Sequence, residues 1–176
     1  MPISLRPAVV GDIAAIRRIY AEAVLAGTAT FEIEPPDEAE MARRMQALLS
    51  RRFPYFVAET AGAMVGYAYA GPYRDRPAYS WCIEDSIYIA PEFHRQGIGR
   101  ALLARLIAES ETRGFRQMIA VIGDTANAAS IAVHAAAGFA LIGTFHAVGF
   151  KHGKWLDTVL MQRPLGASDT SPPEIL

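Results

Sequence analysis

Seven residues near the middle of the chain, His94-Arg95-Gln96-Gly97-Ile98-Gly99-Arg100, place the strongest constraint on its fold. They follow a β-like segment at 83–90 that Pro91 ends, and they lead into a predicted helix at 97–113 with apolar residues at helical spacing. Glycines at such a turn let the backbone approach a ligand closely, and the free N–H groups of a helix N-terminus attract anions. The turn therefore predicts a phosphate site in an α/β fold.

The turn fits neither of two common nucleotide-binding motifs. No Gly-Lys-Ser/Thr follows its glycines, which excludes the phosphate loop of nucleotide hydrolases. Leu102 stands where the dinucleotide-binding fingerprint requires its third glycine. The pyrophosphate of another cofactor remains as the functional interpretation, and a structural turn without a ligand is the alternative that the turn alone leaves open.

The rest of the chain predicts a mixed α/β domain. Hairpin strands come first and a strand–helix–strand–helix–strand order follows, so we expect a mostly antiparallel sheet with a central parallel strand pair and flanking helices. The expected elements are a strand at 3–7, a helix with Asp12 as N-cap, a loop at 27–36, a helix at 37–49, strands at 56–58 and 64–70, a loop at 71–80, a strand at 117–122, a helix from Asn127 to 137, and strands at 139–148 and 154–162.

Length and composition narrow the classes of protein. A chain of 176 residues fits one domain, expected at 1–164, and the Gly, Ser and Pro content of 165–176 predicts a flexible tail. Lys and Arg number 17 against 18 for Asp and Glu, so the basic excess typical of nucleic-acid binding is missing. With one cysteine and no long apolar run or signal peptide pattern, we expect a cytoplasmic protein that binds neither nucleic acid nor a membrane.

The turn resembles the cofactor-binding motif of the GNAT superfamily of N-acetyltransferases. That motif reads Gln/Arg-x-x-Gly-x-Gly/Ala. In this chain Gly97 and Gly99 match its two glycine positions, and His94 stands at its first position. His94 departs from the motif, so the phosphate cradle is expected to depend mainly on backbone N–H groups from Gln96 to Arg100.

Further segments resemble the phosphinothricin acetyltransferase subfamily, which includes enzymes that acetylate methionine sulfoximine and methionine sulfone. The similarity runs from about residue 3 to residue 163, and its most specific piece is Gly-Phe-Lys-x-Gly-x-Trp-x-Asp at 149–157. The other matching segments lie at 28–32, 84–89, 120–124 and 127–139.

The resemblance implies acetyl-CoA as the co-substrate, no metal, direct transfer in a ternary complex, and a homodimer. It places the pyrophosphate on the turn and the pantetheine arm along a strand distorted by a bulge. The cofactor-binding residues that it implies are Ile87, Tyr88, Ile89, Arg95, Gln96, Gly97, Ile98, Gly99, Arg100, Asn127 and Ser130.

Glu84 is the candidate general base. Acetyl transfer needs a neutral amine, so a base must accept a proton from the ammonium. Glu84 shares one strand face with Ser86 and Tyr88, and apolar neighbours such as Ile83 would raise its pKa. The residues alone favour an exposed carboxylate in a salt bridge, whereas the resemblance places the family's base at this position.

His134 is the second candidate catalytic residue. It lies on one side of the predicted helix with Asn127 and Ser130, where many superfamily members carry a tyrosine. Its imidazole would protonate the departing thiolate or orient the acceptor, and a packed histidine without a catalytic part is an equal alternative. Cys82 is interpreted as a structural thiol and not as a nucleophile.

The expected acceptor is a small-molecule amine, namely the α-amino group of an amino acid or analogue such as phosphinothricin, methionine sulfoximine or methionine sulfone. Arg76 and Tyr79 are the candidates for binding its carboxylate, and Phe31 is the candidate for an apolar wall. Two alternatives stay open: an acetyltransferase for protein N-termini or other amines, which predicts a shallow acidic groove, and a non-catalytic module that only binds acetyl-CoA.

Overall fold

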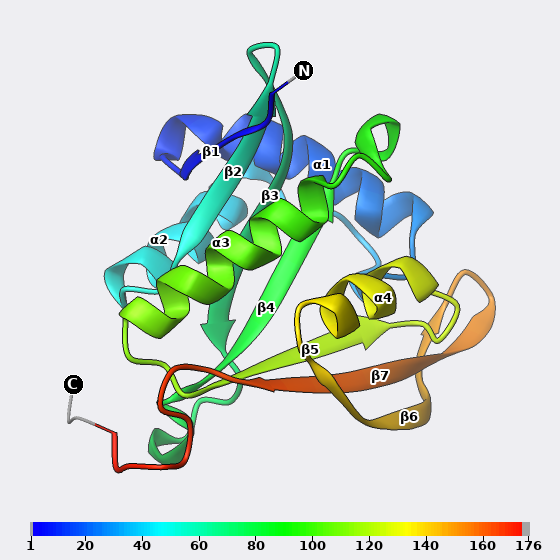
Figure 1. Ribbon diagram of the computed structural model, residues 1–176. Helices are drawn as coiled ribbons and strands as arrows, with labels where there is room; N and C mark the ends of the chain where they lie inside the picture. Colours follow the sequence, from blue (N-terminus) through cyan, green and yellow to red (C-terminus); the bar gives the residue numbers. More distant parts are fainter. Residues whose placement is uncertain (1, 174–176) are drawn as a thin grey trace.

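The computed structural model describes residues 2–173. They form one seven-stranded sheet with helices on both faces (Figure 1). The strand order is β1-β2-β3-β4-β5-β7-β6, and β4 and β5 are the one parallel pair among the described strands. The predicted mixed, mostly antiparallel α/β class is therefore confirmed. The strands are β1 (Ser4–Pro7), β2 (Tyr55–Thr60), β3 (Ala63–Pro72), β4 (Cys82–Ile89), β5 (Gln117–Gly123), β6 (Ala140–Lys151) and β7 (Lys154–Pro164).

The helices begin and end close to the predicted residues. They are α1 (Ile13–Ala26), α2 (Glu38–Ser50), α3 (Ile98–Thr112) and α4 (Ala128–Ala136), with short 3-10 turns η1 (Val10–Asp12), η2 (Pro77–Tyr79) and η3 (Pro91–Phe93). The Asn127 side chain accepts a hydrogen bond from the Ser130 N–H, which confirms the predicted cap of α4. Among residues 2–173, no helix combines the length and the apolar character needed to cross a membrane.

Asp12 does not cap α1 as predicted. Its own backbone is helical and its carboxylate makes no cap hydrogen bond to α1. The carboxylate instead accepts the Val9 N–H at 2.8 Å and pairs with Arg6, which also contacts Glu59 on β2. The cause is the 3-10 turn η1, which extends the helical segment by one turn toward the N-terminus and draws Asp12 into it.

The sheet separates two hydrophobic cores. Helices α3 and α4 cover one face and α1 and α2 the other (Figure 1). Strand β4 contributes to both, because successive side chains of a strand point to opposite faces. Ile83 is fully buried in the α3 core and Tyr88 packs on the α1–α2 core. Glu84 consequently lies on the α1–α2 face and Asp85 on the face of α3 and α4.

Strands β4 and β5 separate halfway along β4. They pair only from Cys82 to Glu84, whereas β4 pairs with β3 from Ile83 to Ile89 without a register shift. The bulge predicted in this strand is therefore absent. The free backbone groups of β4 arise because β5 diverges from it, as Figure 1 shows, and not because β4 is distorted.

Contacts with the domain continue beyond Pro164. Leu165 is fully buried in the α3 core, and its N–H donates to the Arg116 carbonyl at 2.9 Å. The Arg116 guanidinium in turn donates to the carbonyls of Ser168 and Pro172. The last part of the expected tail, 174–176, and Met1 lie outside the described residues. The mobility of the tail remains a prediction.

Candidate active site

The gap between β4 and β5 exposes backbone groups of β4. The Ala90 N–H donates to the Val65 carbonyl of β3, so alternate residues of β4 face β3 and the residues between them face the gap. Ile87 and Ile89 face the gap, and the Ile89 carbonyl accepts a hydrogen bond from His94 Nε2 at 3.0 Å. Among residues 2–173 the N–H and the carbonyl of Ile87 therefore have no strand partner, and they can bind a ligand in the gap.

Tyr88, which was predicted beside these two residues, does not face the gap. Its backbone groups belong to the β3 side, and its ring packs against Tyr20 at 5.0 Å and Tyr67 at 5.2 Å between ring centroids. Burial raises the pKa of its phenol well above the ordinary value. Tyr88 thus supports the α1–α2 core behind the site.

The predicted phosphate turn has the geometry of an anion cradle. Gly97 at the N-cap of α3 has φ +81°, which favours glycine, and no side chain caps the helix. A Cβ at Gly97 or Gly99 would meet no atom within 4 Å, so the space in front of the helix is open. The first turn of α3 holds no acidic residue, while Arg95 and Arg100 are exposed beside it. A pyrophosphate fits this turn.

The other turn residues hold the cradle in place. Ile98 is 2% exposed and anchors the start of α3 in the core. Gln96 Nε2 donates to the Glu92 carbonyl at 3.3 Å, and His94 is bound to Ile89. His94 therefore ties the turn to the end of β4 instead of presenting a free ring to a ligand.

Glu84 has the properties of a general base. Burial and the charge of Asp85 raise the pKa of its carboxyl to about 7, against a lowering effect of Arg74. A base whose pKa lies near neutral pH is free to accept a proton and still strong enough to remove one. The predicted rise in its pKa is present, and its main cause is burial, as expected.

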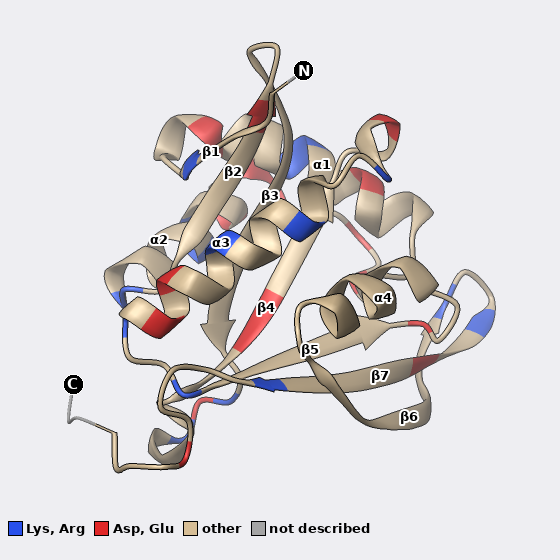
Figure 2. Ribbon diagram, in the orientation of Figure 1, with Lys and Arg blue, Asp and Glu red and all other residues tan. Residues whose placement is uncertain are grey.

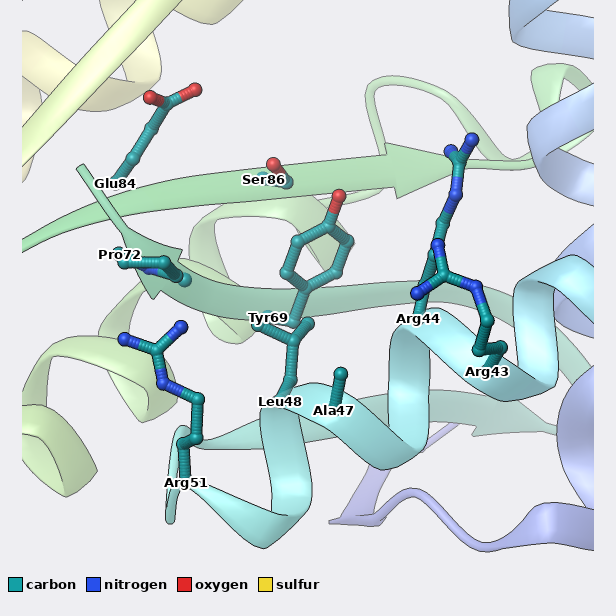
Figure 3. A pocket seen from close by; sticks show the side chains of 10 residues that line it. Arg43, Arg44, Ala47, Leu48, Arg51, Tyr69, Pro72, Glu84 and Ser86 are labelled. Carbon is teal, nitrogen blue, oxygen red and sulfur yellow. The ribbon is translucent and has the colours of Figure 1, made fainter. Parts of the chain in front are cut away.

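Glu84 lies in the wall of a pocket of about 380 Å³ (Figure 3). The remaining lining residues come from α2 and the turn after it, from β3 and from β4: Arg43, Arg44, Ala47, Leu48, Arg51, Tyr69, Gly71, Pro72 and Ser86. Arg44 pairs with Glu32 at 2.6 Å and Glu40 at 2.7 Å. The Arg51 guanidinium lies 5.1 Å from the centroid of the Phe53 ring and has no carboxylate partner among residues 2–173. Figure 3 shows Arg51 at the same end of the pocket as Pro72 and Glu84.

These arginines on α2 and the turn after it were not among the predicted site residues. Their signal was visible as two pairs, Arg43-Arg44 and Arg51-Arg52, along a helix that was otherwise interpreted only as a packing element. Helical spacing alone does not tell which of several surface arginines face a neighbouring strand, because that depends on how α2 packs on the sheet.

The three predicted acceptor residues do not line this pocket. Arg76 and Tyr79 are exposed around η2, where the Tyr79 ring contacts Tyr73 at 5.9 Å between centroids. Phe31 packs against Gly123 and Gly149 at the far ends of β5 and β6. Their part in acceptor binding remains a prediction.

His134 forms a buried pair with a residue that the sequence analysis did not select. Its Nε2 lies 3.0 Å from Asp85 Oδ2, and its Nδ1 lies 2.8 Å from the Ser130 carbonyl and 3.4 Å from Ser130 Oγ. Both ring nitrogens are thus occupied within the chain. Asp85 was overlooked because it faces away from Glu84, and only the fold brings α4 to that side of β4.

The chain matches the acetyltransferase (GNAT) domain family over residues 5–160. It is 53% identical over 163 residues to the phosphinothricin N-acetyltransferase of Alcaligenes faecalis, covering 93% of this chain and 83% of that one. It is 35% identical to the L-methionine sulfoximine/L-methionine sulfone acetyltransferase of Pseudomonas paraeruginosa, with 98% and 100% covered.

A solved structure shares both the fold and much of the sequence. The crystal structure of a phosphinothricin acetyltransferase from Sinorhizobium meliloti in complex with AcCoA superposes with a TM-score of 0.96 at 51% identity, covering 99% of this chain and 94% of that one. Together with the family match and the relatives above, this likeness shows that the chain belongs to the GNAT family of acetyltransferases.

Proposed function

We propose that this protein transfers the acetyl group of acetyl-CoA to the α-amino group of a small amino acid or analogue such as phosphinothricin, methionine sulfoximine or methionine sulfone. The observation that carries the proposal is Glu84, a carboxyl with a pKa of about 7 in the wall of an arginine-lined pocket, at the residue where β4 and β5 separate. The names of the relatives support the same class of acceptor.

The residues of the gap and the turn fit acetyl-CoA, which supplies the acetyl group as a thioester. The backbone N–H groups at the start of α3 would hold the pyrophosphate, with Arg95 and Arg100 beside them. The free backbone groups of Ile87 would bind the amides of the pantetheine arm. Asn127 and Ser130 lie at the start of α4, where the side-chain Oδ1 of Asn127 already accepts the Ser130 N–H.

The chemistry assigned to Glu84 is proton removal. Its carboxylate accepts a proton from the ammonium of the acceptor, and the neutral amine can then attack the thioester carbonyl. A covalent acetyl-cysteine route is disfavoured, because burial raises the pKa of the Cys82 thiol to about 11 and leaves little thiolate at neutral pH. Direct transfer between two bound substrates is the route that these residues support.

The pocket favours an acceptor that carries its own carboxylate. Arg43, Arg44 and Arg51 surround a space beside Glu84, and a guanidinium offers paired donors to a planar carboxylate. A protein N-terminus lacks that nearby negative charge, and the acidic groove expected for it is not found at this pocket. The combination of a base and arginines matches an amino acid, which presents an ammonium and a carboxylate on one carbon.

We also propose that the protein is a cytoplasmic homodimer. The hairpin of β6 and β7 exposes large apolar side chains: Leu141, Ile142, Phe145, Val148, Phe150 and Trp155. No charged residue lies between 140 and 150, so the β6 ribbon is tan along this stretch in Figure 2. An apolar edge strand that a second copy covers would be protected from aggregation.

An acceptor screen tests the proposed function. Release of CoA thiol from acetyl-CoA is measured with phosphinothricin, methionine sulfoximine, methionine sulfone, the common amino acids, and peptides with a free N-terminus. We expect thiol release with small amino acids or their analogues and little with peptides. Release with peptides alone would favour the N-terminal acetyltransferase, and tight acetyl-CoA binding without release for any acceptor would favour the non-catalytic module.

A further inference from the structure

Asp85 and His134 connect β4 to α4 across the mouth of the gap. The side chains of Asp85 and His134 are 2% and 6% exposed, and their contact is 3.0 Å long. Asp85 comes directly after Glu84, the last residue of β4 that pairs with β5. The pair therefore links β4 to α4 next to the residue at which β4 and β5 separate.

The hydrogen bonds of His134 determine where its protons lie. A carbonyl oxygen only accepts, so Nδ1 must carry a hydrogen to bind the Ser130 carbonyl at 2.8 Å. The Nε2 to Asp85 contact then needs a second proton between the ring and the carboxylate. Burial lowers the pKa of His134, but the bond and charge of Asp85 together with the Ser130 carbonyl outweigh it, and the net pKa is raised above 6.5. A carboxylate and a carbonyl as the two partners of the ring both favour the proton on the imidazole.

The same carboxylate acts on Glu84 from the other side of the strand. Its negative charge raises the pKa of Glu84, while Arg74 lowers it, and Cys82 and Tyr69 are the further titratable neighbours of Glu84. Asp85 Oδ1 is buried and has no hydrogen-bond partner among residues 2–173. One oxygen of Asp85 thus holds His134, and the other accepts no hydrogen bond from the described residues.

We propose that Asp85 is a positioning residue for acetyl transfer, which holds the His134 imidazolium at the point where β4 and β5 separate. The inference deepens the proposed function and rests on it, since Glu84 and the gap are taken as the site of transfer. With both ring nitrogens occupied, His134 supplies a fixed positive charge to the gap and not a freely available proton. Asp85 sets both that charge and the basicity of Glu84.

The first experiment uses the unmodified protein and needs no turnover. Nitrogen-15 labelling of histidine lets NMR follow His134 through a pH titration, with His134→Gln to assign its signal among the four histidines. We expect an imidazolium with both nitrogens protonated at about pH 7.5, whereas an ordinary histidine with a pKa near 6.5 would be roughly one tenth protonated. A neutral His134 ring at that pH would overturn the proposal.

The second experiment compares Asp85→Asn with Asp12→Asn. Both replace a buried, paired carboxylate by its isosteric amide, but Asp12 lies in η1, directly before α1, and pairs with Arg6. In Asp85→Asn we expect the pKa of His134 to fall to near its ordinary value of about 6.5, and kcat at about pH 7.5 to fall by up to roughly tenfold with the imidazolium fraction. The pH optimum should move to lower pH, because Glu84 loses a negative neighbour as well. Asp12→Asn should lower thermal stability and leave the pH profile in place.

The outcomes separate this proposal from the proposed function. An unchanged His134 titration in Asp85→Asn, or a pH profile that coincides with that of the unmodified protein, would overturn the positioning role. A protein that turns over no amino acid in the acceptor screen contradicts the proposed function, and the His134 titration still decides whether Asp85 holds an imidazolium. If Asp85→Asn does not fold, the titration of the unmodified protein decides alone.

Discussion

The Phe31 ring lies directly over Gly149, where a Cβ would meet the ring atom Cδ2 at 2.6 Å. A Cβ at Gly123 would lie 3.1 Å from the ring atom Cε1 of the same side chain. The loop that carries Phe31 is also bound to β6 by Lys151, whose buried Nζ donates to the Thr30 carbonyl at 2.9 Å. Two glycines and a buried lysine thus fix the place of one aromatic side chain.

Gly149→Ala should displace Phe31 and raise the KM for the acceptor. The added methyl group overlaps the ring, and overpacking of this kind costs about 1–3 kcal/mol unless the ring moves. The KM for acetyl-CoA should stay the same, because the turn at 94–100 is not touched. Steady-state kinetics with each substrate varied in turn give both values.

Gly143→Ala is the matched control for this change, since it lies on the same strand and a Cβ there would meet no atom within 4 Å. Equal acceptor KM values for the two variants would contradict a role of Phe31 in acceptor binding.

Arg51→Gln should weaken binding of an acceptor that carries a carboxylate. Arg51 lines the pocket with Glu84, and its guanidinium lies over the Phe53 ring without a carboxylate partner among residues 2–173, so its N–H donors can bind a ligand carboxylate. Loss of a charge-assisted hydrogen bond of about 1.5–3 kcal/mol corresponds to a rise in KM of roughly tenfold or more. Arg52→Gln removes the neighbouring arginine, which is outside the pocket, and should leave KM unchanged. A larger effect of Arg52→Gln would place the carboxylate elsewhere.

Changes in the phosphate turn should separate backbone from side-chain contributions. Gly97→Ala forces a Cβ into a residue with φ +81°, at a cost of about 1–2 kcal/mol, and should lower acetyl-CoA affinity clearly. His94→Ala should lower it only modestly, because the ring binds the Ile89 carbonyl. Gly99→Ala, which the family motif tolerates, is the control. Calorimetric titration measures the acetyl-CoA affinity of the three variants. A loss of affinity in His94→Ala equal to that in Gly97→Ala would show that the His94 ring contacts the cofactor directly.

The fold was largely predictable because its signals are local. The apolar spacing of α3, the glycine turn before it and the Asn127 cap each depend on residues close together in sequence, and all three were found. The bulge expected in β4 was wrong, because the free backbone results from the divergence of β5, a strand more than 25 residues away in sequence. Asp12 does not cap α1 because the turn η1 precedes the helix and includes it, and its carboxylate is held by Arg6 on β1.

Residues of the proposed site were selected from the sequence only where a motif marked them. Glu84 and the turn were selected through the resemblance, and their roles remain predictions. Asp85 and Arg51 carry no motif, since only the packing of α4 brings His134 to Asp85 and only the packing of α2 brings Arg51 near Glu84. Tyr88 was selected with Ile87 and Ile89 as one run, although alternation along a strand turns its backbone toward β3. The sequence pattern does not specify contacts between segments that are distant in sequence.

Glu84→Gln should lose activity and gain stability. The rate of the unmodified protein should rise with pH through about 7 as Glu84 loses its proton, whereas the variant should be roughly 10²- to 10⁴-fold slower and follow the deprotonation of the amine itself. Stability should change with pH in the opposite direction to the rate. Because the pKa of Glu84 in the folded protein lies above the ordinary 4.5, its contribution to the free energy of unfolding is complete below pH 4.5 and is lost as pH rises through about 7.

At 1.36 kcal/mol per pKa unit, this rise corresponds to a contribution of about 3 kcal/mol to the free energy of unfolding. That value is an upper limit, because Glu84 lines an open pocket where solvent screens part of the effect. Gln stays neutral at every pH, so above pH 7 the variant should be more stable than the unmodified protein, and below about pH 4.5 the two should be equal. Urea unfolding at several pH values measures the difference. A stability gap that does not change with pH would mean that Glu84 is not the buried, readily protonated carboxyl on which the proposed chemistry depends.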